Sequence, residues 1–278
     1  MTQFSALRIL ILMLMLGILG ATLPLLAQSE FEIMADESLN WDRDLKQYHA
    51  LGNAVVKTEN ITLRADEIIA YYQTIDGQDR ILRADAIGRV IAQNGASIAY
   101  GDKGVYHMES DIIVLIGKDL RVINQNGKIT AKDTIEYWNK QNIAVARGDA
   151  TLQQQDKFVR AGTLTAFINA DQKQEDAPKQ TQEQNNVGDS QVYRVDATGG
   201  VHVSTATEIL VADQGVYLVP EQEFKLCGNL KITRGENQLN GECANLNMAT
   251  GVSQMLGLGG SNRIQGLIVP QKKQESPQ

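Results

Sequence analysis

The amino-acid sequence predicts an all-β protein, built from repeated antiparallel strands and preceded by an N-terminal signal segment. Apolar and polar residues alternate through most of the chain, which is typical of strands with one buried and one solvated face. A weak unit of roughly thirty residues also recurs about seven times. Such self-similarity indicates stacked copies of one supersecondary unit, none of which can bury its apolar face alone.

Residues 1–27 have the features of a secretory signal. Arg8 precedes an apolar stretch from Ile9 to Ala27, and polar residues follow from Gln28. The stretch is also nearly long enough to cross a bilayer, so an uncleaved membrane anchor remains an alternative to a signal that is cleaved after Ala27. Both alternatives predict that the rest of the chain is exported.

Each repeat carries two marks, an acid after a small residue and a glycine between apolar runs. In five copies the acid and the glycine lie 15 or 16 residues apart. The acids are Asp36, Asp66, Asp102, Asp133, Asp213 and Glu242, with Ala161-Gly162 as a degenerate copy. The glycines are Gly52, Gly88, Gly117, Gly148, Gly199, Gly228 and, loosely, Gly257. A glycine inside a strand often marks a bulge or a sharp bend.

Turn signals such as Asp76-Gly77 and Asn94-Gly95 separate the alternating runs and set the boundaries of two strands per repeat. The strands are expected at 31–41, 46–58, 61–73, 80–93, 96–107, 111–123, 127–138, 142–154, 157–169, 192–205, 207–219, 223–234, 237–248 and 252–269. After the signal segment no window has a convincing helical period.

The repeat predicts a single domain over residues 30–270. The segment 171–191 interrupts the period and is rich in Gln, Glu, Asp and Asn, so we expect a disordered insertion between strands. The tail 271–278 is similarly polar and is also expected to be disordered.

Cys227 and Cys243 flank a turn signal at residues 234–236. A three-residue hairpin loop there places the two cysteines directly opposite each other. Cross-strand neighbours can form a disulfide if they face the same side of the sheet, and exported proteins permit such bonds. The alternative is a pair of free thiols on a β surface.

Composition and motifs exclude several function classes. The formal net charge is −7 and no segment is strongly basic, so the chain lacks the Lys/Arg footprint of a nucleic-acid-binding protein. His49, His107 and His202 are scattered, and no nucleophile elbow or phosphate-binding Gly-rich loop is present. We therefore predict no catalytic residue, no metal site, no cofactor and no enzymatic activity.

Glycines at the same level of successive strands would bend the sheet lengthwise into a V. The inward positions hold small or medium apolar residues, which either leave room for a long apolar guest such as an acyl chain or pack into a narrow dry core. The pattern leaves these two alternatives open. The candidate groove residues from the alternation are Ala54, Val56, Ile61, Leu63, Ala150, Leu152, Val201, Val203, Leu230 and Ile232.

Three stretches of the sequence are similar to a known repeat. Residues 50–56, 61–66 and 227–232 resemble the organic-solvent-tolerance (OstA) repeat, and residues 30–265 resemble in plan the LptA/OstA family of periplasmic lipopolysaccharide transport proteins. The resemblance implies a taco-like, V-shaped β-jellyroll whose apolar interior holds lipopolysaccharide acyl chains. Phe31 and Ile33 occupy the places from which the family's first strand contributes inward apolar residues.

The resemblance also implies a role and partners. A family member of this kind is a bridge that carries lipopolysaccharide across the periplasm. It links an inner-membrane LptC-like protein to an outer-membrane LptD-like protein and stacks end to end with further copies through edge strands. The longer C-terminal half and the insertion at 171–191 depart from the family pattern.

Three alternatives remain open on sequence grounds. The first is a membrane-anchored LptC-like component of the same pathway. The second is a carbohydrate-active β-helix enzyme, which requires parallel coils and clustered acids. The third is a structural surface protein, which would bind no lipid.

Overall fold

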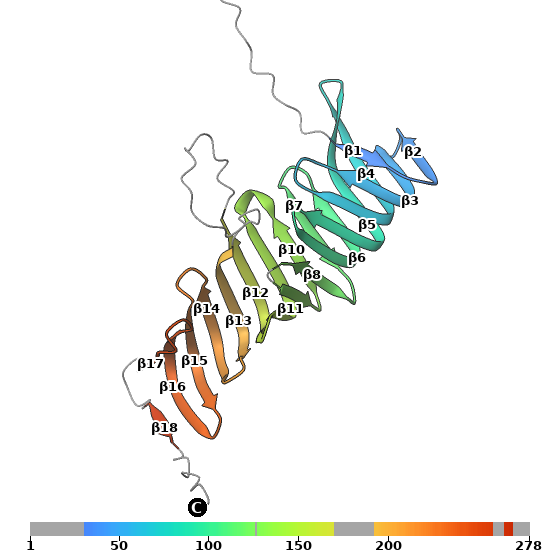
Figure 1. Cartoon of the computed structure of the whole chain (residues 1–278). Helices are drawn as coiled ribbons and strands as arrows, with labels where there is room; N and C mark the ends of the chain where they lie inside the picture. Colours follow the sequence, from blue (N-terminus) through green and yellow to red (C-terminus); the bar gives the residue numbers. More distant parts are fainter. Residues whose placement is uncertain (1–30, 126, 170–191, 258–263, 269–278) are drawn as a thin grey trace, which may run out of the picture. The chain divides into compact units, whose positions relative to one another are not determined.

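A computed structural model describes residues 31–125, 127–169, 192–257 and 264–268 (Figure 1). These residues form one antiparallel sheet of eighteen strands and a short 3₁₀ turn, η1, at Asn139–Gln141, which confirms the all-β prediction. The predicted signal segment 1–27, insertion 171–191 and tail 271–278 lie outside the described residues.

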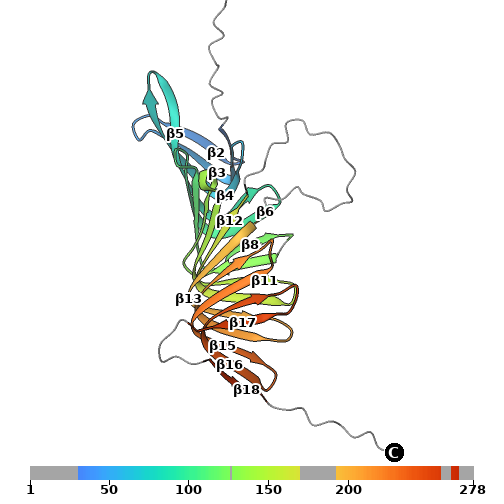
Figure 2. The ribbon, with the colours of Figure 1, turned by 90° about the vertical axis from the view of Figure 1, so that its left-hand side faces the viewer.

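The strands follow one another along the chain, with loops between most of them of only a few residues. They are β1 Glu32–Met34, β2 Ser38–Asp42, β3 Gln47–Lys57, β4 Thr62–Ile75, β5 Gln78–Asn94, β6 Ser97–His107, β7 Ile112–Ile116, β8 Leu120–Asn124, β9 Gly127–Ala131, β10 Thr134–Trp138, β11 Ile143–Gln154, β12 Lys157–Ile168, β13 Val192–Ser204, β14 Ile209–Leu218, β15 Glu223–Arg234, β16 Asn237–Asn247, β17 Ser253–Leu256 and β18 Gln265–Leu267. Most consecutive long strands pair directly, and the colours pass from blue at one end of the sheet through green to red at the other in Figure 2.

Four of the predicted strands are each divided into two short strands. Residues 31–41 form β1 and β2, residues 111–123 form β7 and β8, residues 127–138 form β9 and β10, and residues 252–269 contain β17 and β18. At the first division the backbone N–H groups of Asp36 and Glu37 still donate to the carbonyls of Gly52 and Leu51, over 2.8 and 3.1 Å. The chain therefore turns a corner there without losing its cross-strand hydrogen bonds.

The sheet has two walls that meet along the line of repeat marks. Wall A contains β2, β7, β10 and β17, and wall B contains β1, β8, β9 and β18; the long strands pass from one wall to the other. For example, residues 47–51 of β3 pair with β2, whereas residues 55–57 pair with β1. The register shifts where each long strand crosses, as between Leu51 and Ala54.

The contact between Asp66 and Gly88 explains why the repeat needs both of its marks. Gly88 has a φ of +77°, and a Cβ at this position would lie 2.4 Å from Asp66 Oδ2. Asp66 Oδ1 also accepts a hydrogen bond of 2.7 Å from Arg89 Nε. The glycine thus supplies both the left-handed backbone and the space for the acid of the neighbouring strand.

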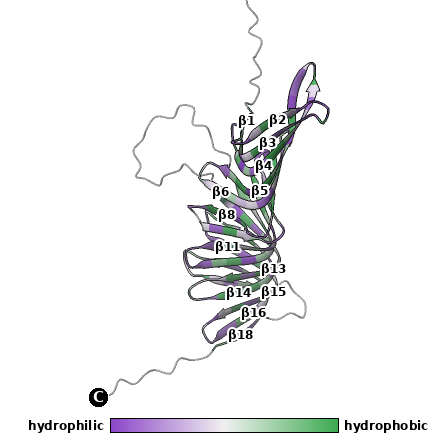
Figure 3. Cartoon of the chain, turned by 90° about the vertical axis from the view of Figure 1, so that its right-hand side faces the viewer, coloured by the Kyte–Doolittle hydropathy of each residue, from purple (hydrophilic) through white to green (hydrophobic). Residues whose placement is uncertain are grey.

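The core lies between the two walls. Hydrophobic residues alternate with polar ones along the strands (Figure 3), and the inward set forms one continuous buried cluster. Every strand pairing among the described residues is antiparallel, so the parallel coils required for a β-helix enzyme are excluded.

Candidate functional site: the apolar interior between the walls

The inner face of wall B carries a continuous apolar row. Cross-strand pairing sets Ile33 opposite Val56, Val56 opposite Leu63 and Leu63 opposite Ala92 in the N-terminal half. In the C-terminal half the corresponding row of cross-strand neighbours consists of Leu152, Val159, Val203, Leu210 and Ile232. The strand alternation thus places one line of apolar side chains along the interior.

The structure brings all of the predicted groove residues into the buried cluster. Nine are buried: Ala54, Val56, Ile61, Leu63, Ala150, Val201, Val203, Leu230 and Ile232. Phe31, Ile33 and Leu152 are partly buried and pack against the same cluster. Their common location leaves open whether the interior admits a ligand, because burial is a property of both a groove and a dry core.

A narrow apolar cavity of about 40 Å³ lies between the walls in the C-terminal half. Wall B lines it with Leu152, Gln154, Lys157, Val159, Val201 and Val203, and wall A with Val195, Ala197, Gly215, Tyr217, Phe224 and Leu226. Only Gln154 and Lys157 contribute polar side chains apart from the Tyr217 hydroxyl. The space holds a few water molecules at most, so an acyl chain enters only if the walls move apart.

The N-terminal half also has large, tightly buried side chains in its interior. Leu63, Ile68, Leu115 and Leu120 are at most 1% exposed. Tyr106 is also buried there, and its hydroxyl donates a hydrogen bond of 2.6 Å to Asp111 Oδ1. Burial, followed by this carboxylate, raises the pKa of Tyr106 well above its ordinary value, so the phenol stays protonated.

The predicted groove residues include none of the wall A lining and neither polar residue of the cavity, Gln154 and Lys157. Tyr217 and Phe224 pair directly across β14 and β15, with ring centroids 4.2 Å apart. The alternation in these strands could have identified both rings. Lys157 carries no such signal, because a charged residue at a strand end is expected to face solvent.

Both ends of the described sheet have short edge strands. At one end β1 and β2 pair with β3, and at the other β17 and β18 pair with β16. Leu39, Trp41 and Leu45 are exposed at the first end, and Val252 and Leu267 at the second. Unpaired edges with exposed apolar side chains are templates for strand addition.

Cys227 and Cys243 are directly opposite each other on β15 and β16, with their Cα atoms 4.1 Å apart. Their sulfur atoms are joined in a disulfide. The bond therefore crosslinks the last pair of long strands before the edge formed by β17 and β18.

An exposed cluster of charges lies at the crossing of β11 and β12. Arg160 donates two hydrogen bonds to Asp149, one of them 2.7 Å long, and Lys132 Nζ lies 2.7 Å from Asp149 Oδ2. Arg160, and then Lys132, lower the pKa of Asp149 to about 2. The acid Asp149 directly follows the bulge glycine Gly148. In the N-terminal half, the corresponding glycines are followed by the uncharged Asn53 and the basic Arg89.

Two further properties of the described residues bear on the site. In the described part of the chain, no three His, Cys, Asp or Glu side chains come close enough to hold a metal ion. No helix within the described ranges is long and apolar enough to cross a membrane.

Comparisons with known proteins identify a family and a similar solved structure. The family model described as "LptA/(LptD N-terminal domain) LPS transport protein" matches the chain twice, over residues 32–143 and 128–252. No curated protein matches the chain significantly. A crystal structure of LptH, described as the LptA homologous periplasmic component of the lipopolysaccharide transport device of Pseudomonas aeruginosa, is 17% identical to the chain. It covers 51% of this chain and 94% of its own, with a TM-score of 0.41.

Proposed function

This chain belongs to the LptA/(LptD N-terminal domain) family of lipopolysaccharide transport proteins, and from that premise we propose that it carries lipopolysaccharide between the inner and outer membranes by shielding the acyl chains between its walls. The family consists of transport proteins and not of enzymes. The observation that carries the proposal is the apolar interior, with a cavity lined by residues of both walls.

The hydrophobic effect supplies the reason for such a shield. Each methylene group that leaves water for an apolar site is worth about 0.8 kcal/mol, so several acyl chains cannot cross an aqueous compartment unprotected. An interior that continues along the stacked strands covers the chains while the sugars remain in water.

The fold offers a low-cost way to admit the chains. The ladder hydrogen bonds of the described strands run within each wall, and the facing inner surfaces meet through apolar side chains such as Val203 and Leu226. Separating the walls exchanges these contacts for similar contacts with acyl chains and leaves the ladders intact. Lipid entry therefore requires bending at the bulges and not strand unpairing.

The edge strands support the proposed assembly. We propose that β1 and β2 at one end and β17 and β18 at the other dock by strand addition, to an inner-membrane LptC-like protein, to an outer-membrane LptD-like protein and to further copies of this chain. Residues 30–270 act as one domain in this proposal, because β10 and β11 continue the pairing through both ranges that match the family.

Site-specific photo-crosslinking tests the shield. A photoreactive residue at Ile33 or Leu152, on the inner face, is expected to label lipopolysaccharide in cells. The adjacent outward positions Glu32 and Gln153 are matched controls that should label it weakly. Equal labelling from both faces, or labelling from the outward sites alone, contradicts the proposal, and a structural surface protein would give no lipid adduct at all.

The membrane-anchored LptC-like alternative depends on the N-terminus. We propose export to the periplasm with removal of residues 1–27, so the mature chain should begin near Gln28. N-terminal sequencing of the protein from cells separates the two variants, because an intact apolar segment in the membrane fraction identifies the anchored one.

A further inference from the structure

Two turns at the end of wall B have the same structure but differ in one inward residue. In the N-terminal half, Thr58 N donates to Ile61 O over 2.9 Å, and Ile61 N donates to Thr58 Oγ1 over 3.2 Å. In the C-terminal half, Thr205 and Glu208 make the same pair of bonds, over 2.9 and 3.2 Å. Ile61 and Glu208 are therefore equivalent positions.

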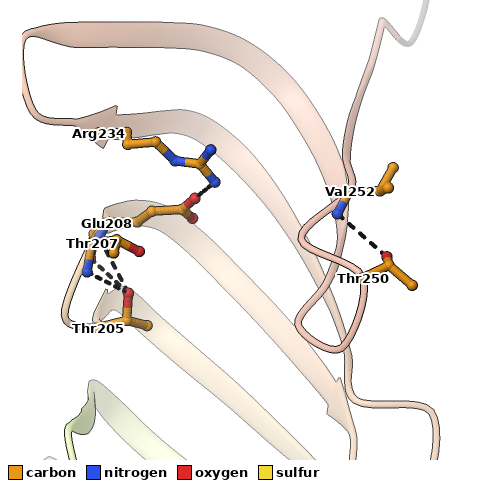
Figure 4. A network of polar contacts seen from close by, with 6 residues as sticks. All are labelled: Thr205, Thr207, Glu208, Arg234, Thr250 and Val252. Atoms are coloured by element: carbon orange, nitrogen blue, oxygen red, sulfur yellow. Dashed lines mark hydrogen bonds and ion pairs between the residues drawn. The ribbon is translucent and has the colours of Figure 1, made fainter.

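Both residues face the interior. Ile61 is 3% exposed and Glu208 is 9% exposed, and each is followed by buried residues at the next two inward positions. Glu208 is the buried charged residue of the described chain. It pairs with Nη2 of Arg234 at the end of β15 (Figure 4).

The difference extends to the neighbouring inward positions at the rim of wall B. When the two halves are aligned by their strand pairings, three rim positions of the N-terminal half correspond to three rim positions of the C-terminal half. These equivalent pairs are Phe31 and Lys157, Ile61 and Glu208, and Asn94 and Arg234. A neutral rim in one half thus corresponds to a charged rim in the other.

The charged rim includes one residue of the cavity lining, Lys157. Arg234 lies at the wall B end of β15, two residues beyond the buried Ile232. The side chain of Arg234 is 58% exposed although Glu208 anchors one of its nitrogens. A guanidinium carries five N–H donors in a fork, so an anchored and exposed Arg can also bind a phosphate.

We propose that Lys157 and Arg234 bind the phosphate groups of a doubly phosphorylated glycolipid whose acyl chains occupy the interior of the C-terminal half, an inference that rests on the proposed function. Glu208 holds the guanidinium of Arg234 at the rim. Lys157 lies on β12 and Arg234 on β15, three strands apart, which corresponds to ~14 Å at the usual strand spacing. One phosphate cannot bridge this distance, so the two cations suit two phosphates on one sugar headgroup.

The test compares binding of two probes to the full-length protein. The probes are lipid A with both phosphates and the same lipid after enzymatic dephosphorylation. Arg234→Asn, which copies Asn94, and Lys157→Gln are each expected to weaken binding of the phosphorylated probe about tenfold, the loss of one charge-assisted contact. Neither change should alter binding of the dephosphorylated probe.

The matched control is Lys231→Asn, which removes a cation from the exposed outer face of the same strand as Arg234 and should change neither affinity. Inorganic phosphate at the concentration of the lipid should not compete, because it lacks the acyl chains. Arg234→Asn leaves the buried Glu208 without its partner and is expected to lower the unfolding temperature, so affinities are compared at a temperature at which thermal unfolding shows every variant to be folded.

The outcomes separate the two proposals. If the wild type binds both probes and Arg234→Asn and Lys157→Gln bind them with unchanged affinity, the rim assignment is wrong and the shielding function stands. Equal losses for both probes would likewise contradict a phosphate contact. If the wild type binds neither probe, the transport proposal itself fails, and the rim assignment fails with it.

Discussion

The N-terminal and C-terminal halves share one backbone plan and use it differently. Both halves have bulges at the repeat glycines and the same threonine turn at the end of wall B. Both halves bury large side chains such as Leu63 and Leu226, but the first has Ile61 at its inward rim, whereas the second has Glu208 there and a cavity lined by Val203. The repeat therefore specifies the path of the chain, and the side chains at equivalent positions specify what the interior can accept.

Exchanging the rim residues has the largest expected effect. Ile61→Glu buries a carboxylate opposite Asn94 instead of an arginine and should lower the free energy of unfolding by about 3–5 kcal/mol at neutral pH. The reverse change, Glu208→Ile, leaves Arg234 unpaired but exposed and should change the free energy of unfolding very little. Urea denaturation of both variants measures the difference, and equal costs would contradict the equivalence of the two positions.

A second comparison concerns the bulge glycines. Gly88→Ala and Gly200→Ala both place a Cβ at a positive φ, +77° and +81°, but only the former meets a neighbour, Asp66 Oδ2 at 2.4 Å. We expect the free energy of unfolding to fall by about 1 kcal/mol for Gly200→Ala, because of backbone strain alone. For Gly88→Ala we expect a fall of about 2–3 kcal/mol, because the new Cβ also meets Asp66. The two denaturation midpoints check this order, and a reversed order would show that the acid does not constrain the bulge.

The smallest expected effect concerns Asp149, an acid at the bulge position that the basic Arg89 occupies in the N-terminal half. The folded-state pKa of about 2 lies below the ordinary value of 3.8, so the ion pairs stabilise the protein above pH 4 and this contribution is lost as the pH falls towards 2. Asp149→Asn should remove this part of the acid sensitivity and change stability little at pH 7, because the group is exposed. Thermal unfolding from pH 7 to pH 2 provides the measurement.

The alternation predicted much of the fold and of the site. Residues such as Val56, Leu63 and Val203 could be assigned to the inner face because side chains on a strand alternate with a period of two. The divisions inside four predicted strands were missed, since an acid such as Asp36 or Asp133 can continue a strand or turn a corner. A glycine on the neighbouring strand faces the acid in both cases, as Gly148 faces Asp133 and Gly88 faces Asp66 of the continuous β4, so the repeat marks do not distinguish them.

Glu208 shows why the rest of the site could not be predicted. A charged residue in an alternating segment is expected to face solvent, and its partner Arg234 follows only after another complete strand. The lining of the cavity has the same difficulty, because Leu152, Tyr217 and Phe224 come from three strands and two walls.

The local pattern of this chain is sufficient for an antiparallel β fold with a repeated bend, because strand period, turn residues and bulge glycines act on the backbone nearby. Whether the interior is filled or hollow, and which charges reach it, was decided by the tertiary structure. Those properties depend on the volumes and partners of side chains that meet only after the walls have assembled.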